Sequence, residues 1–215
     1  MKFKQELDLS TVIFQDSLEK MFDKDTVDVL LDLEKTIQDF WNVDRQSANF
    51  LNLMVKITGA KSALEIGTSN GYSAIWIAKA LKETDGKLTT LEFWEKRSDL
   101  AIENFKKTGV NDIITVITGD AVQILADMKE ENKHKFDFIF VDANKAEYIE
   151  YYKSFDSMLN IGGIIIADNI LSHYKKTKDY VETLMNNENY QSQLLNFEAG
   201  MLLSKKNQII TQVGN

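Results

Sequence analysis

Residues 62 to 73 read SALEIGTSNGYS, a stretch that predicts a strand, a sharp turn and the start of a helix. Residues 63–66 form a short apolar run, and residues 72–81 follow a helical apolar pattern. Gly67 and Gly71 lack a Cβ atom, so the chain can turn tightly and a ligand can approach the backbone. The helix start adds free N–H groups. We therefore expect a ligand-binding turn between a strand and a helix.

Glu65 indicates which ligand this turn suits. It occupies the place of the first glycine in the dinucleotide fingerprint G-x-G-x-x-G, and the motif here is E-x-G-x-x-x-G. A carboxylate at this place repels a pyrophosphate but can accept hydrogen bonds from an amino group. This favours S-adenosylmethionine, which carries an ammonium and a sulfonium and no phosphate.

The rest of the chain predicts an α/β fold of the Rossmann type. Strands and helices alternate, which is typical of a doubly wound, mainly parallel sheet. The strands are expected at residues 63–66, 87–91, 113–118, 136–141 and 164–167, and the helices at 72–81, 96–108, 121–130, 148–159 and 175–185. Residues 191–197 and 201–204 predict a closing antiparallel hairpin.

The N-terminal part predicts a helical cap on this sheet or a subunit contact. Residues 7–43 have the apolar rhythm of two amphipathic helices, and residues 45–57 predict a third that ends at Gly59. A length of 215 residues fits one domain, with residues 1–57 as the cap and residues 60–215 as the core.

Composition excludes several classes of protein. The absence of cysteine excludes disulfides and thiolate sites, and no apolar run reaches the ~18–20 residues that span a bilayer. The first residues lack the apolar core of a signal peptide, so the cytoplasm is the default expectation. The net charge of −8 opposes non-specific binding to nucleic acids.

Three oxygen-bearing side chains follow predicted strands. Asp142 comes directly after one strand, and Asp168 and Asn169 come after another. Adjacent parallel strands lie ~4.8 Å apart, so such side chains can meet around one ion. Two carboxylates and an amide oxygen suit Mg²⁺ or Ca²⁺. The alternative is that the aspartates cap the segments that follow them, but their joint position at strand ends favours a metal.

Further candidate residues stand near the same strand ends. Lys145 could take a proton from a hydroxyl beside a metal, although most single lysines are solvated. Glu92 could hold ribose hydroxyls. Asp120 could meet an adenine edge or, equally, cap the next helix. Phe93 and Trp94 could contact adenine, but packing in the core is the favoured interpretation for both.

Three segments together resemble a known family. They are residues 60–68 with 71–73, residues 136–145 with Tyr148, and residues 162–171. The chain is similar there to the cation-dependent class I O-methyltransferases, the group of catechol and caffeoyl-CoA O-methyltransferases. The likeness covers residues 45–205. It implies a seven-stranded sheet with the last strand antiparallel, and often a homodimer.

The resemblance also implies roles for individual residues. It makes Asp142, Asp168 and Asn169 ligands of Mg²⁺, with Ca²⁺ or Mn²⁺ as other candidates, and makes Lys145 the base or the group that orients the substrate. We take Lys145 and Asp142 as the catalytic residues. The residues that it assigns to the S-adenosylmethionine site are Val43, Glu65, Gly67, Ser73, Glu92, Ala121 and Asn144, to which we add Asp120 and Asp142. The chain departs from the family at Asn144 and at residues 93–96 and 170–176. The last of these segments helps form the substrate pocket, so the acceptor is the open question.

The sequence therefore predicts an S-adenosylmethionine-dependent, metal-assisted O-methyltransferase that acts on a catechol-like, vicinal dihydroxy small molecule. A hydroxylated uridine of tRNA is the alternative acceptor, because Lys175, Lys176 and Lys178 could serve a nucleic acid. A nucleotide-binding oxidoreductase or a non-catalytic cofactor-binding protein is the alternative of another class.

Overall fold

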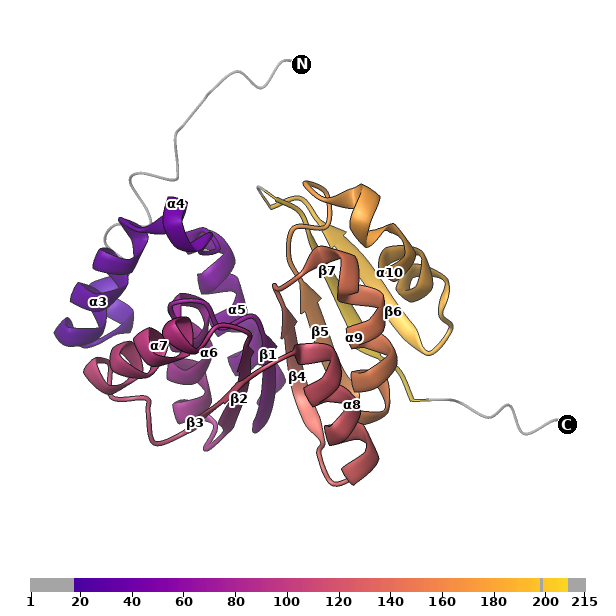
Figure 1. Ribbon diagram of the computed structural model, residues 1–215, viewed down its shortest axis with the longest axis horizontal. Helices are drawn as coiled ribbons and strands as arrows, with labels where there is room; N and C mark the ends of the chain where they lie inside the picture. The colour runs from indigo at the N-terminus through magenta and orange to yellow at the C-terminus, as the bar shows by residue number, and fades with distance from the viewer. Residues whose placement is uncertain (1–17, 198, 209–215) are drawn as a thin grey trace, which may run out of the picture.

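The computed structural model describes residues 18–197 and 199–208 (Figure 1). The part of the N-terminal helical prediction that falls before residue 18 lies outside this range. From there to residue 43 the chain forms three helices rather than the end of two, namely α2 (Leu18–Met21), α3 (Lys24–Glu34) and α4 (Ile37–Phe40). Asp23 separates the first two, because its side chain accepts a hydrogen bond from the backbone N–H of Thr26 and caps α3.

A seven-stranded sheet forms the centre of the structure, as predicted. Its strands are β1 (Ser62–Ile66), β2 (Lys87–Glu92), β3 (Ile114–Thr118), β4 (Phe136–Val141), β5 (Leu159–Ala167), β6 (Tyr190–Leu195) and β7 (Met201–Lys206). The spatial order is β3-β2-β1-β4-β5-β7-β6. The first five strands pair in parallel, and β7 runs antiparallel to both β5 and β6.

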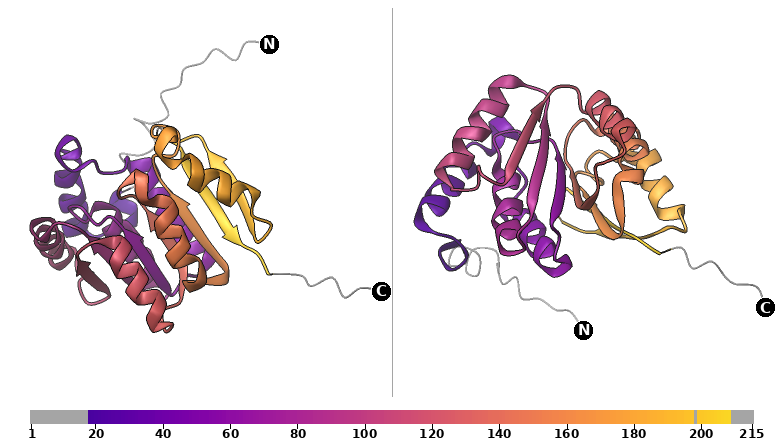
Figure 2. Two further views of the ribbon diagram at one scale, coloured as in Figure 1. Left: turned by 45° about the vertical axis from the view of Figure 1, so that its right-hand side comes forward. Right: turned by 90° about the horizontal axis from the view of Figure 1, so that it is seen from below.

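Helices cover both faces of the sheet (Figures 1 and 2). One face packs against α5 (Arg45–Thr58), α6 (Tyr72–Glu83) and α7 (Glu95–Lys107), and the other against α8 (Ala121–Glu131), α9 (Tyr148–Phe155) and α10 (Tyr174–Asn186). The central strand β4 shows why both faces need cover. Phe138 and Phe140 belong to the first apolar cluster, whereas Ile139 and Val141 belong to the second.

The predicted helix over residues 148–159 is too long. Helix α9 ends at Phe155, a 3₁₀ turn covers Asp156–Met158, and β5 begins at Leu159, five residues before the predicted start at residue 164. Leu159 pairs with Phe136 of β4, which gives its backbone a partner in the sheet. The register then shifts, and Gly162, at a φ of 83°, lies within the irregular part.

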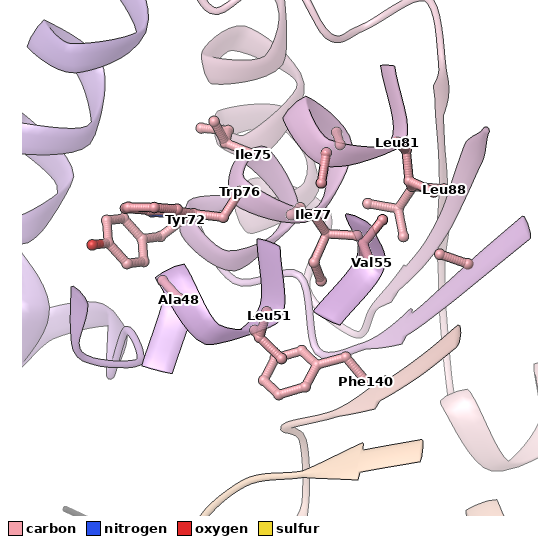
Figure 3. Packing of buried hydrophobic residues seen from close by; sticks show 14 of the residues in the cluster. Ala48, Leu51, Val55, Tyr72, Ile75, Trp76, Ile77, Leu81, Leu88 and Phe140 are labelled. Atoms are coloured by element: carbon pink, nitrogen blue, oxygen red, sulfur yellow. The ribbon is translucent and has the colours of Figure 1, made fainter. Parts of the chain in front are cut away.

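The N-terminal helices are tied to the core by apolar packing and by one polar cluster. Tyr72 and Trp76 of α6 and Leu51 of α5 are fully buried, and Leu51 lies beside Phe140 (Figure 3). Glu34 of α3 forms an ion pair with Arg45 and accepts a hydrogen bond of 2.7 Å from the hydroxyl of Tyr72. In the described part of the chain, no helix is long and apolar enough to span a membrane.

The Phe140 ring tests how much the packing of α5 on the sheet contributes to stability. Phe140→Ala should lower the free energy of unfolding by about 3–5 kcal/mol, because the ring is fully buried and the site cannot fully collapse. Ile57→Ala on the outer face of α5, where the side chain is 67% exposed, should change it by less than about 0.5 kcal/mol. Urea denaturation measures both. An equal loss in the two variants would contradict the packing described here.

Candidate active site

A cavity of about 620 Å³ lies where the strand order reverses, at the carboxyl ends of β1, β2 and β4. Such a place is where open α/β sheets bind ligands. Nine of the residues predicted for a cofactor or a catalytic role line it: Val43, Gly67, Ser73, Glu92, Asp120, Ala121, Asp142, Asn144 and Lys145. Glu65, Asp168 and Asn169 are outside this lining.

The turn after β1 lies against the end of β4. Gly67 has a φ of 107°, and a Cβ atom on it would come within 2.2 Å of the carbonyl oxygen of Asp142. The backbone N–H groups of Gly67 and Thr68 both donate to the carbonyl of Leu91 in β2, at 2.9 and 3.1 Å. Glycine is therefore required here by close backbone contact as well as by conformation.

Glu65 lies behind the cavity lining. It is fully buried, and its two carboxylate oxygens accept hydrogen bonds from the hydroxyls of Ser73 (2.7 Å) and Thr90 (2.6 Å). Thr90 in turn shares a hydrogen bond of 2.5 Å with Thr68. Burial raises the pKa of Glu65 to about 8 despite these two hydrogen bonds. Glu65 is therefore connected to the cavity lining by hydrogen bonds, directly to Ser73 and by way of Thr90 to Thr68.

Glu92 is placed to hold two neighbouring hydroxyls. It is 6% exposed, and its oxygens accept hydrogen bonds from the backbone N–H groups of Ser69 (2.8 Å) and Trp94 (2.9 Å). Each carboxylate oxygen can accept a further hydrogen bond, because it has a second lone pair. These two contacts fix the carboxylate at the end of β2, facing the cavity.

Asp120 has the capping role that the sequence allowed, and it lies at the cavity in which the adenine contact is predicted. Its Oδ1 accepts hydrogen bonds from the N–H groups of Val122 (2.8 Å) and Gln123 (3.3 Å), so it caps α8, and the residue also lines the cavity. Across the same cavity, Glu147 accepts hydrogen bonds from the side-chain amide of Asn144 (2.7 Å) and the hydroxyl of Tyr151 (2.6 Å). Neither Glu147 nor Tyr151 was predicted to contact a ligand.

Asp142 and Asp168 follow residues that pair across two adjacent strands. Val141 of β4 pairs with Ala167 of β5, so the two aspartates leave the sheet side by side. Lys145 donates a hydrogen bond of 2.7 Å to Asp142. Asp168 is 5% exposed, and its burial, with the negative charge of Asp142, raises its pKa to about 7. Two carboxylates, of which Asp168 is buried and Asp142 partly buried, thus lie together with one lysine.

This donor set fits a hard divalent cation. Across residues 18–197 and 199–208, no group of three or more His, Cys, Asp or Glu side chains could hold a metal, so a site would need the amide oxygen of Asn169 as its third protein ligand. Asn169 directly follows Asp168 and has a left-handed φ of 59°. A divalent ion would compensate the charge of the two aspartates, and carboxylate and amide oxygens are its preferred ligands.

An aromatic rim borders the cavity at the end that holds Glu92. Phe93 and Trp94 are 59% and 61% exposed, so their favoured assignment to the core is wrong. Trp41, from the loop after α4, is 75% exposed and also lines the cavity. Phe40 and Arg97 complete the rim, and neither was predicted. Alternating apolar patterns cannot distinguish such rim residues from core residues.

The buried Glu65 should give the apoprotein a specific pH dependence. Its folded pKa of about 8 lies above the ordinary value of 4.5. The stability that it contributes is therefore fully present below pH 4.5 and is lost as pH rises through 8. Glu65→Gln keeps the uncharged form at every pH, so the free energy of unfolding of this variant should fall less than that of the wild type between pH 5 and about 9.

Urea denaturation at a series of pH values checks this expectation. In the variant, the amide oxygen can accept from Ser73, while Thr90 can accept from the amide NH₂ group and donate its own proton to Thr68. Glu188→Gln, at an exposed glutamate, serves as the control and should follow the wild type. Parallel pH profiles for wild type and Glu65→Gln would show that Glu65 is ionised in the fold.

The chain is similar to known proteins over most of its length. A model of the O-methyltransferase family matches residues 23–208. A catechol O-methyltransferase of Niastella koreensis is 38% identical over 130 residues, which are 60% of this chain and 58% of the relative. A caffeoyl-CoA O-methyltransferase of Eucalyptus globulus is 38% identical over 142 residues, which are 64% of this chain and 57% of the relative. The matched segments thus span under two thirds of these relatives.

Among solved structures, an O-methyltransferase from Bacillus cereus in complex with SAH superposes with a TM-score of 0.79 at 26% identity, covering 93% of this chain and 96% of that one. The seven-stranded sheet and its antiparallel last strand agree with this likeness. The family model covers far more than half of the sequence. The chain belongs to the O-methyltransferase family.

Proposed function

We propose that this protein transfers a methyl group from S-adenosylmethionine to a hydroxyl of a catechol-like small molecule, with the assistance of a divalent cation. The observation that carries the proposal is the joining of two features at one sheet edge. The acidic cavity beside the Gly67 turn suits the methyl donor, and the Asp142–Asp168 pair next to it suits a metal. The relatives named above support the reaction type.

The charges of the cavity favour this cofactor over a dinucleotide. Its lining contains the carboxylates of Glu92, Asp120, Asp142 and Glu147, against the two cations Arg97 and Lys145. S-adenosylmethionine has a net positive charge, whereas the pyrophosphate of NAD is negative and would be repelled. Glu92 would hold the ribose hydroxyls, and Asp120, Ala121 and Asn144 would border the adenine. Val43, Gly67 and Ser73 would border the methionine part, with Glu65 acting through Ser73.

Lys145 and Asp142 would carry the proton transfer. A divalent ion bound by Asp142, Asp168 and Asn169 would lower the pKa of an acceptor hydroxyl. Lys145 would then take the proton, while Asp142, 2.7 Å away, holds the amine in position. The hydroxyl oxygen attacks the methyl carbon, the carbon–sulfur bond breaks, and its electron pair stays on sulfur. Alignment of the two reactants would supply most of the rate.

The charge distribution favours a small acceptor over tRNA. Lys175, Lys176 and Lys178 are exposed on α10, but Lys178 lies 3.6 Å from Glu182. The chain as a whole carries a net charge of −8, which opposes the approach of a polyanion. Methyl transfer to a panel of catechols, compared with bulk tRNA, separates the two acceptors.

The Gly67 turn tests the cofactor assignment. The wild type should bind SAH in a calorimetric titration and should not bind NAD. Gly67→Ala should weaken SAH binding at least ~100-fold, because its Cβ would overlap the carbonyl of Asp142 and displace the turn. Gly59→Ala is the matched control, since Gly59 also has a positive φ but no atom lies within 4 Å of its added Cβ. Binding of NAD instead of SAH would indicate the oxidoreductase alternative.

The aspartate pair tests the metal. Asp142→Asn and Asp168→Asn should each lower metal-dependent methyl transfer to a catechol by at least ~100-fold, because a metal ligand and its charge are lost. Asp179→Asn, an exposed position on α10, should leave the rate unchanged. Transfer is measured with and without excess chelator. Full activity of the wild type in chelator would refute the role of the metal while leaving the cofactor assignment intact.

A further inference from the structure

The segment between α3 and α5 is anchored at both ends but not in its middle. Leu33 and Val43 are 8% and 6% exposed, whereas α4, between them, contains no buried residue. Trp41 ends α4 in the left-handed conformation, with a φ of 54°. An element that buries no side chain is held by few contacts and can open at low cost. Yet Phe40, Trp41 and Val43 line the proposed cofactor cavity.

Few interactions connect α4 and Trp41 to the opposite side of this cavity. The hydroxyl of Ser69 donates a hydrogen bond of 3.0 Å to the carbonyl of Phe40. The guanidinium carbon of Arg97 lies 5.7 Å from the ring centroid of Phe40 and 5.6 Å from that of Trp41. Arg97 belongs to the first turn of α7, where its N–H donates to the carbonyl of Trp94. It therefore connects the helix that follows β2 to the segment that covers the cavity.

The charges around Arg97 indicate that its role is to bind the rings and not the cofactor. Its guanidinium forms none of the ion pairs found within the described residues. The other charged residues of the lining are acidic except for Lys145, which suits a cationic ligand that an arginine would repel. A guanidinium over an aromatic face is held by cation–π attraction, and here two rings share it.

We propose that Arg97 and Trp41 are a pair that holds α4 closed over the nucleoside end of the cofactor cavity and thereby slows the release of the product SAH. The inference rests on the proposed function, because it assumes that this cavity binds S-adenosylmethionine and SAH. Opening would separate Trp41 from Arg97 and let α4 move away, while Leu33 and Val43 stay packed. Both are positioning residues, since neither reaches the reacting atoms.

The test measures the dissociation rate of SAH by surface plasmon resonance on the immobilised full chain. Arg97→Met keeps the apolar stem and removes the charge, and Trp41→Leu removes the ring. Trp41→Leu should raise the dissociation rate about fivefold, the size that one cation–π contact predicts. Arg97→Met should raise it at least as much, because this change also removes the contact with Phe40. The double variant should be less than about twofold faster than Arg97→Met, because Arg97→Met already removes the contact that Trp41→Leu removes. Arg97→Lys should restore part of the slow release.

Two controls separate this role from others. Lys96→Met makes the same charge change on the adjacent, exposed residue of α7 and should leave the dissociation rate unchanged. Melting temperatures of the ligand-free variants, measured by calorimetry, reveal a purely structural role. Such a role would lower the melting temperature without changing SAH dissociation, which would overturn the proposal.

The remaining outcomes are also decisive. If Arg97→Met accelerates release but Trp41→Leu does not, Arg97 acts through Phe40 or through the ligand and not through Trp41, and the pair is refuted. Effects that multiply fully in the double variant would show two independent contacts and would refute it too. A wild type that binds no SAH at all would instead overturn the proposed function, whereas tight wild-type binding with unchanged rates in the variants would overturn the Arg97–Trp41 pair alone.

Discussion

The contact between the backbone at Gly67 and the carbonyl of Asp142 is the constraint on which the site depends. It leaves no room for a side chain, since a Cβ at residue 67 would lie 2.2 Å from that oxygen. The contact brings the turn after β1 against the end of β4, so the residues that border the cavity and those that could bind a metal share one edge of the sheet. Parallel pairing of β1 with β4, and of β4 with β5, then fixes their relative heights.

Buried carboxylates give this edge its chemical character. Glu65 has its charge suppressed by burial and by the nearby Asp142 and Glu92, although two hydroxyls donate to it. Asp168 is held in a similar state by burial and by Asp142. Such groups cost stability when they ionise without a cation nearby. A cationic methyl donor and a divalent ion would each relieve part of this cost. Their binding is therefore coupled to the ionisation of these carboxylates.

The sequence predicted the sheet well where local pattern and burial agree. The apolar runs of β1 and β4 and the glycines of the first turn identified these two strands and the turn between β1 and α6. Prediction from the sequence was wrong where contacts between distant segments determine the structure. The early start of β5 depends on pairing of Leu159 with Phe136, and the exposure of Phe93 and Trp94 depends on a cavity that no periodic pattern encodes. No sequence pattern indicated the ring contacts of Arg97, because its partners, Phe40 and Trp41, are distant in the sequence.

A crystal structure with SAH and Mn²⁺, using anomalous scattering to locate the metal, tests the central claim most directly. We expect SAH in the cavity of about 620 Å³, with its ribose at Glu92 and its sulfur facing Asp142, and one Mn²⁺ peak between Asp142, Asp168 and Asn169. A metal peak elsewhere, or SAH bound away from the Gly67 turn, would contradict this claim.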